Sequence, residues 1–140
     1  MYDIAVIGSG PAGLSAAVQA RARNRSVLVV GGDDRDNPLY KTPRIDNYLG
    51  FPQVSGKELL ERFRAHADDM GVTRKEGRVL NIMPMGDTFY LSIGSEMEQA
   101  RAIILATGVV WANKYPGEAE YLGRGVSYCA TCDGMLYRGK

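Results

Sequence analysis

The sequence has little of several residue types on which whole classes of function depend. It contains one histidine and two cysteines in 140 residues, and its formal net charge is +1. A charge so close to zero gives no electrostatic reason to expect a nucleic-acid or membrane partner. Structural zinc takes four nitrogen or sulfur ligands, whereas the cysteines and the histidine together supply at most three. A metal centre is therefore a weak interpretation, and we expect none.

A long hydrophobic run is also missing. The longest stretch without a charge, residues 4–20, is interrupted by Gly8, Gly10, Pro11 and Gly13, and no basic segment precedes it. It is also shorter than the roughly 20 residues that cross a membrane. We therefore expect neither a signal peptide nor a membrane span, and we expect a cytoplasmic protein. In that compartment two cysteines so close together are more often catalytic or metal-binding than structural.

The length and the first apolar segments predict an α/β domain. Residues 3–7 form a nearly all-apolar run that ends in glycines, which is typical of a buried parallel strand. Residues 12–23 are rich in alanine and follow Pro11, so a helix is expected there. Residues 26–30 form a second, β-branched strand. The order is strand, helix, strand, with a right-handed connection.

The next segment is expected to be a long ordered loop, residues 31–56, and loops of that length usually have a function. Apolar residues at helical spacing then predict an amphipathic helix over residues 57–70. His66 lies beside the apolar stripe of this helix, so we expect a surface or boundary residue there rather than a catalytic one.

Three strands are predicted after this helix, at residues 78–85, 88–93 and 99–106, with glycine turns between them. The first two alternate in polarity and are expected to be half exposed. The third contains I-I-L-A and is expected to be fully buried as it returns to the core. From residue 109 the sequence is irregular again.

The glycine-rich turn at residues 8–13 is the first candidate binding site. Gly-Ser-Gly-Pro-Ala-Gly fits G-x-G-x-x-G, and it closes a buried strand and opens a helix within a βαβ unit. In such a turn the first glycine permits the bend, the second lets the backbone approach a pyrophosphate, and the third lets the helix pack on the strand. Asp33, with Asp34 beside it, ends the second strand, where a carboxylate accepts hydrogen bonds from ribose hydroxyls. The simpler alternative is a structural turn with two surface aspartates.

Four motifs in order along the chain carry a family resemblance: V-I-G-S-G-P-A-G-L-S-A-A, R-I-D-N-Y-L-G-F-P, I-I-L-A-T-G and G-R-G-V-S-Y-C-A-T-C-D-G. Together they closely resemble the low-molecular-weight thioredoxin reductases, which are pyridine nucleotide-disulfide oxidoreductases. This resemblance implies a Rossmann-like FAD-binding domain with a parallel sheet and a β-meander. It also implies NADPH as electron donor, thioredoxin or a similar small disulfide protein as partner, and a homodimer.

The resemblance also implies cofactor contacts. The turn would cradle the FAD pyrophosphate, Asn47 with Asp46 before it would approach the flavin, and Val79 would contact the adenine through its backbone. The returning strand would line the cofactor where it ends. The implied set is Gly8, Ser9, Gly10, Pro11, Ala12, Gly13, Asp33, Asn47, Val79, Ala106, Thr107 and Gly108.

One segment departs from the family pattern. Where the relatives carry Gly-Gly-Gln-Leu, this chain has Asp36, Asn37, Pro38 and Leu39. The glutamine whose amide would meet the flavin is thus a proline, whose side chain donates no hydrogen bond. An altered flavin environment and an unusual electron donor are both compatible with this change.

The C-x-x-C motif of Cys129 and Cys132, followed by Asp133, has three interpretations: half of a metal site, an inert buried pair, or a redox dithiol. Vicinal thiols interconvert with a disulfide in one two-electron step, which favours the third. By the family resemblance Cys132 would be the sulfur on the flavin side, Cys129 would attack the partner disulfide, and Asp133 would manage the proton.

The resemblance predicts two domains: residues 1–114 as the FAD-binding part, and residues 115–140 as the connection to a second, NADPH-type domain that is expected after Lys140. The leading hypothesis is a flavin-dependent thioredoxin-disulfide reductase. One alternative is a related flavin reductase with another partner protein or a donor other than NADPH. The other is a nucleotide-binding module without turnover. Since no second glycine turn of this kind follows, we expect no NADPH turnover by these 140 residues alone.

Overall fold

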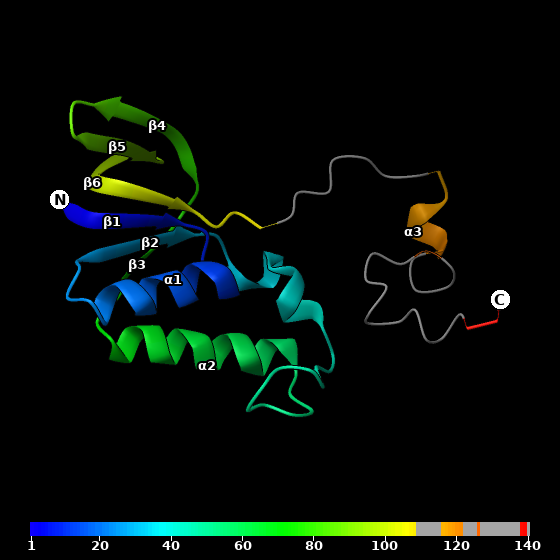
Figure 1. Ribbon diagram of the computed structural model, residues 1–140. Coiled ribbons are helices and arrows are strands. Elements are labelled where there is room, and N and C mark those ends of the chain that lie inside the picture. The colour runs from blue at the N-terminus through cyan, green and yellow to red at the C-terminus, as the bar shows by residue number, and fades with distance from the viewer. Residues whose placement is uncertain (109–115, 122–125, 127–137, 140) are drawn as a thin grey trace. The chain divides into compact units, whose positions relative to one another are not determined.

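A computed structural model describes residues 1–108, 116–121, 126 and 138–139 (Figure 1). The chain divides into two compact units, Met1–Gly108 and Val109–Lys140, and each is described by itself. The elements of the first unit are β1 (Tyr2–Ile7), α1 (Pro11–Arg21), β2 (Val27–Gly31), the 3-10 helices η1 (Asp34–Asp36) and η2 (Pro38–Lys41), α2 (Gly56–Asp69), β3 (Thr73–Glu76), β4 (Val79–Met85), β5 (Thr88–Ile93) and β6 (Glu96–Leu105).

The strands of the first unit form one six-stranded sheet in the order β3-β2-β1-β6-β5-β4. The strands β3, β2, β1 and β6 run parallel, and β6, β5 and β4 continue as an antiparallel meander. Figure 1 shows α1 and α2 side by side below β1 and β2. The predicted α/β class, with a parallel sheet and a β-meander, is confirmed.

One face of the parallel strands packs against the two helices. Val6 of β1 and Val29 of β2 are almost fully buried, and they form one cluster with Leu14 of α1 and Leu60 of α2. Alternate side chains of a strand point to opposite faces, so these residues define the helix side of the sheet. Each fully buried aliphatic side chain of this kind contributes roughly 1.5–3 kcal/mol.

The opposite face packs against the meander. Leu28 and Val30, the alternate residues of β2, cluster with Ile93 at the end of β5. Lys75 of β3 forms ion pairs with Glu96 and Glu98 of β6, the latter at 2.7 Å. The meander therefore folds back over the sheet, and the unit has three layers: helices, parallel strands and meander.

Most of the predicted elements are confirmed, but three expectations were wrong or incomplete. The strand β3 was missed because T-R-K-E carries no apolar pattern; it is an edge strand, where charged side chains are common. The loop at residues 31–56 contains two short 3-10 helices. The I-I-L-A segment is not fully buried, since Ile103 and Ile104 are half-buried and Leu105 is exposed.

The second unit contributes α3 (Glu118–Tyr121), which follows Gly117. The predicted domain boundary between residues 114 and 115 lies outside the described residues and stays a prediction. Among the helices of the described residues, none is long and apolar enough to cross a membrane.

Candidate functional site

The glycine-rich turn lies where β1, β2 and the end of β6 meet. The Gly8 N–H donates to the Val30 carbonyl at 2.7 Å, and the Ala106 N–H donates to the Ile7 carbonyl at 2.8 Å. A Cβ on Gly8 would lie 2.0 Å from the Ala106 carbonyl oxygen, and the φ of Gly8 is +120°. Only glycine fits this position, because both the space and the backbone conformation exclude a side chain. The turn thereby comes into contact with residues 106 and 107.

Gly13 holds α1 against the strand that precedes it. A Cβ at this position would lie 1.9 Å from the Gly8 carbonyl oxygen and 3.3 Å from Cγ1 of Val6. A similar contact joins β2 to the turn, because a Cβ on Gly31 would lie 2.1 Å from Oγ of Ser9. These contacts are between parts of the protein itself, so Gly13 and Gly31 are required by packing.

Gly10 has different surroundings. Within 4 Å of a Cβ built on Gly10, the one atom of the described residues is Nδ2 of Asn37, at 3.2 Å. The backbone of Gly10 is extended, with φ −80° and ψ −176°, which any residue adopts. The backbone conformation therefore does not require a glycine here, and the protein packing disfavours a Cβ only through this one close side-chain contact. A ligand that approaches the backbone closely does explain the glycine, as a pyrophosphate would.

The start of α1 is suited to an anion. Gly10 is the N-cap, Pro11 follows it, and in the described residues no side chain caps this end and no acid lies in the first turn. The first N–H groups of a helix have no partners within the helix, and they carry a partial positive charge. A phosphate group fits such a terminus.

Asp33 follows β2, as expected, but its carboxylate is engaged by a neighbour. Nε and Nη2 of Arg35 lie 2.9 and 2.5 Å from Oδ2 of Asp33, and the Arg35 backbone N–H donates to Oδ1 at 2.9 Å. The side-chain hydrogen bond from Arg35 is the main reason that the pKa of Asp33 is lowered to about 2. Asp34 points elsewhere and pairs with Arg64 of α2. A ribose hydroxyl would therefore share the Asp33 carboxylate with Arg35.

The loop that contains Asn47 is exposed. Asp46 accepts from Nε of Arg44 at 2.9 Å, and the bridge between Ile45 and Val54 closes the loop. Asn47 is exposed to solvent. Tyr48 returns to the helices, where its ring centroid lies 5.3 Å from that of Phe63.

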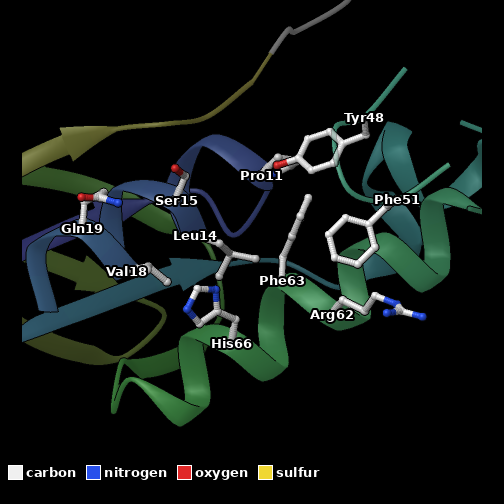
Figure 2. A pocket seen from close by; sticks show the side chains of 10 residues that line it. All are labelled: Pro11, Leu14, Ser15, Val18, Gln19, Tyr48, Phe51, Arg62, Phe63 and His66. Carbon is white, nitrogen blue, oxygen red and sulfur yellow. The ribbon is translucent and has the colours of Figure 1, made fainter. Parts of the chain in front are cut away.

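A groove of about 340 Å³ lies between α1, α2 and this loop (Figure 2). Pro11 and Leu14 line it from α1, Tyr48 from the loop, and Phe63 and His66 from α2. His66 is exposed at the groove, so the expectation of a surface or boundary residue is confirmed. Of the predicted cofactor residues Pro11 alone, in the described part of the chain, lines this groove, so the groove adjoins the turn without being the predicted site.

Three comparisons with known proteins agree with this geometry. The sequence profile of the family described as Pyridine nucleotide-disulphide oxidoreductase matches residues 2–140. The chain belongs to this family.

Relatives within the family are thioredoxin reductases. The chain is 36% identical to the thioredoxin reductase of Bacillus subtilis (strain 168), with 100% of this chain and 45% of the relative covered. The crystal structure of thioredoxin reductase from Streptococcus pyogenes MGAS5005 has a TM-score of 0.83 and 36% identity, over 97% of this chain and 45% of that one. The resemblance drawn from the motifs is thus confirmed, and the chain spans about half the length of the curated relatives it matches.

A further solved structure stands out by its identity to this chain. The ferredoxin-flavin thioredoxin reductase from Clostridium acetobutylicum is 51% identical, with a TM-score of 0.74, over 97% of this chain and 47% of that one. Membership in the pyridine nucleotide-disulphide oxidoreductases implies an oxidoreductase that binds flavin. Which atoms of this chain hold the flavin stays a prediction.

The structure gathers part of the predicted set. The turn, Ala106 and Thr107 lie together, and Asp33 lies at the end of the neighbouring strand. Val79 is half-buried on the meander side of the sheet, where it packs against the clusters of Leu91 and Leu28. Gly108 has a φ of +74° and lies at the end of the first unit. The contacts of all these residues with a cofactor stay predictions.

Cys129, Cys132 and Asp133 lie outside the described residues.

Two residues beside the turn were not predicted as site residues: Gly31, which packs on Ser9, and Asn37, which lies over Gly10. The Gly-Gly pair after the second strand signals the first, because a strand that ends in glycine permits close approach of another backbone. No local pattern signals the position of Asn37, which depends on how the loop folds back.

Proposed function

We propose that this chain forms the FAD-binding part of a flavin-dependent thioredoxin-disulfide reductase. The observation that carries the proposal is the turn around Gly10, in a chain of this family. A Cβ at Gly8 or Gly13 would collide with backbone, whereas a Cβ at Gly10 would meet only the Asn37 amide among the described residues, at an uncapped helix start. FAD fits there, since its diphosphate would meet the N–H groups of α1.

The proposal assigns the cofactor contacts of the chain. The turn at residues 8–13 would hold the diphosphate, Asp33 the ribose, and the backbone of Val79 the adenine. Asn47 would lie toward the flavin, and residues 106–108 would line the cofactor from the end of β6. Residues 1–114 would form this domain, and residues 115–140 would lead into a second domain.

Disulfide chemistry is assigned to the C-x-x-C motif. A flavin bound here, once reduced by the electron donor, would supply the electron pair that reduces the disulfide between Cys129 and Cys132. With two protons taken up, the pair becomes a dithiol. The Cys129 thiolate then attacks the disulfide of thioredoxin, and Cys132 displaces the mixed disulfide, so that the partner leaves as a dithiol and the original disulfide forms again. Asp133 would exchange protons with these sulfurs.

The remaining parts of the proposal concern the assembly: NADPH as electron donor, a homodimer, and a cytoplasmic location. For the donor, one similarity supports a second candidate. The chain is 51% identical to a ferredoxin-flavin thioredoxin reductase, against 36% for the thioredoxin reductases of Bacillus subtilis and Streptococcus pyogenes. Reduced ferredoxin would then replace NADPH, while the cysteine chemistry would be unchanged.

The decisive experiment follows thioredoxin reduction in the purified flavin-loaded protein and its cysteine variants. Cys129→Ser should abolish transfer to thioredoxin. Cys132→Ser should leave a thiol that forms a stable mixed disulfide with thioredoxin, visible by mass spectrometry without reductant. Transfer that survives both substitutions contradicts the proposal. So does a protein that releases NAD instead of FAD when it is denatured.

The donor is tested separately, in this chain and in a version that carries an NADPH-type domain after Lys140, because no NADPH turnover is expected from the 140 residues alone. Flavin reduction is followed by absorbance after mixing with NADPH or with chemically reduced ferredoxin. Rapid bleaching by NADPH supports the first candidate, and bleaching by ferredoxin alone supports the second. Reduction by dithionite is the control that the flavin and the cysteines are competent whichever donor is used.

A further inference from the structure

Asn37 is held in one orientation by its own hydrogen bonds. Its backbone N–H donates to the Asp34 carbonyl at 2.9 Å, and its carbonyl accepts from the Tyr40 N–H at 3.0 Å. Its side-chain Oδ1 accepts from the Leu39 N–H at 3.0 Å, which caps η2. The residue therefore links η1 to η2, and its side chain has little freedom to turn.

The cap fixes which end of the amide faces the turn. A backbone N–H requires an acceptor, so the oxygen must face Leu39 and the nitrogen must point away from it. That nitrogen lies 3.2 Å from the position of a Cβ on Gly10. Within the described residues Nδ2 of Asn37 donates to no protein acceptor. A half-buried donor thus lies directly over Gly10, at the uncapped start of α1.

The charges around Asn37 indicate what kind of acceptor it meets. The first turn of α1 contains no acid, and its N–H groups have no partners within the helix. Three carboxylates precede Asn37 closely in the sequence. Asp33 pairs with Arg35 and Asp34 with Arg64, whereas Asp36 is exposed and forms no ion pair within the described residues. The uncapped N–H groups of α1 and the Asn37 amide are donors on the side of Gly10 and favour an anionic ligand there, and a diphosphate supplies acceptor oxygens in adjacent positions.

We propose that the side-chain amide of Asn37 donates a hydrogen bond to the diphosphate of the bound dinucleotide. This inference rests on the proposed FAD site and adds a phosphate-binding residue that the motifs do not assign. In the segment that departs from Gly-Gly-Gln-Leu, Asn37 stands in place of the second glycine. This departure from the family pattern thus supplies a hydrogen-bond donor to the phosphate, while Pro38 removes the amide that would face the flavin.

Two substitutions separate the donor from the cap. Asn37→Ser keeps an oxygen that can accept from the Leu39 N–H, but the shorter side chain no longer extends over Gly10. Asn37→Asp keeps the shape and the cap, and it replaces the donor with a negative charge. Asn81→Ser is the matched control, because Oδ1 of Asn81 also accepts from a following backbone N–H, that of Ile82 at 2.9 Å, on the meander strand β4.

The measurement is the dissociation constant of FAD and of ADP, which carries a diphosphate without the flavin, for purified protein stripped of nucleotide. Asn37→Ser should weaken both by about tenfold, or about 1.4 kcal/mol, and Asn37→Asp should weaken both further. The thermal midpoint of the nucleotide-free protein should stay unchanged in both variants, and Asn81→Ser should bind as the wild type does.

Each other outcome overturns the inference in a distinct way. Weaker FAD binding with unchanged ADP binding places Asn37 against the flavin rather than the diphosphate. A lower thermal midpoint with unchanged affinities makes Asn37 a structural cap alone. Unchanged affinities in both variants remove any role in binding. If the wild-type protein binds neither FAD nor ADP, the proposed function itself fails, which distinguishes that failure from the others.

Discussion

The second and third glycines of the turn have different surroundings, so alanine at each position separates cofactor binding from folding. A Cβ on Gly13 meets the Gly8 carbonyl oxygen at 1.9 Å, and neither backbone can move freely. Gly13→Ala should therefore lower the free energy of unfolding by roughly 2–3 kcal/mol. In Gly10→Ala the new methyl group would press on the Asn37 amide at 3.2 Å but on no backbone atom of the described residues, so the loss of stability should be smaller, below about 1 kcal/mol, while FAD affinity should fall at least tenfold.

Urea unfolding of the nucleotide-free proteins and FAD titration measure the two effects. The wild-type protein is the reference for both, and each variant is the control for the other. Equal losses of stability in the two variants would contradict the difference in packing. Unchanged flavin content in Gly10→Ala would contradict the assignment of the diphosphate to this turn.

Asp33 offers a pH-dependent prediction at the same scale. Arg35 donates hydrogen bonds to its carboxylate, and the pKa of Asp33 is lowered from 3.8 to about 2. Because the pKa is lower in the folded protein, the ion pair contributes to stability above pH 4 and loses that contribution as the pH falls toward 2. Arg35→Ala should return the pKa of Asp33 toward its ordinary value. Carbon-13 NMR titration of the carboxyl group measures this directly, and an unchanged midpoint in Arg35→Ala would show that Arg35 is not the cause.

At the scale of elements, the contact between η1 and α2 positions the end of β2. Asp34 and Arg64 form an ion pair whose side chains are 18% and 23% exposed, respectively. Burial lowers the pKa of Arg64, although a guanidinium stays charged at any pH at which proteins fold. Removal of either partner leaves the other charge poorly solvated. Asp34→Asn or Arg64→Met alone should therefore cost roughly 1–3 kcal/mol.

The double variant tests whether the two side chains act through each other. If they do, Asp34→Asn combined with Arg64→Met should cost clearly less than the sum of the single changes. Chemical unfolding of the four proteins gives the coupling. The exposed pair of Arg62 and Glu58, 2.7 Å apart within α2, is the matched control and should show a coupling below about 1 kcal/mol. Additive losses at Asp34 and Arg64 would mean that the pair does not position η1.

Elements with a strong local pattern could be predicted from the sequence, and elements set by their neighbours could not. β1, α1 and β2 have apolar runs or alanine-rich spacing that belong to the segments themselves. β3 has no such pattern, because it adds to an edge and keeps its charged side chains at the surface. In the site, Gly8, Gly10 and Gly13 follow from one local motif. The place of Asn37 depends on hydrogen bonds within η1 and η2 and on contact with α1, which no spacing along the chain encodes.

For the whole molecule, the described residues that form the three layers of the first unit all lie within Met1–Gly108. The helix-side cluster and both meander-side clusters consist of residues from this unit, and so do the contacts around the turn. Residues 1–108 alone should therefore unfold in one cooperative transition. We expect the free energy of unfolding to fall by no more than about 1 kcal/mol relative to the 140-residue chain. In a domain of this size, such a loss lowers the thermal midpoint by roughly 4–8 °C.

The same piece should keep the diphosphate site and lose disulfide chemistry. Residues 1–108 contain the turn, Asn37 and Ala106, so ADP should bind with an affinity within about threefold of that of the longer chain, a difference of less than about 1 kcal/mol. Cys129 and Cys132 are not in this piece, so it cannot form the mixed disulfide with thioredoxin.

Circular dichroism tests the cooperative unfolding, calorimetric titration with ADP tests the binding, and mass spectrometry tests the absence of the mixed disulfide. Gly10→Ala within residues 1–108 is the binding control. A piece that unfolds without cooperativity would show that the layers depend on contacts with residues after 108. A folded piece that does not bind ADP would show that the diphosphate site needs those residues as well.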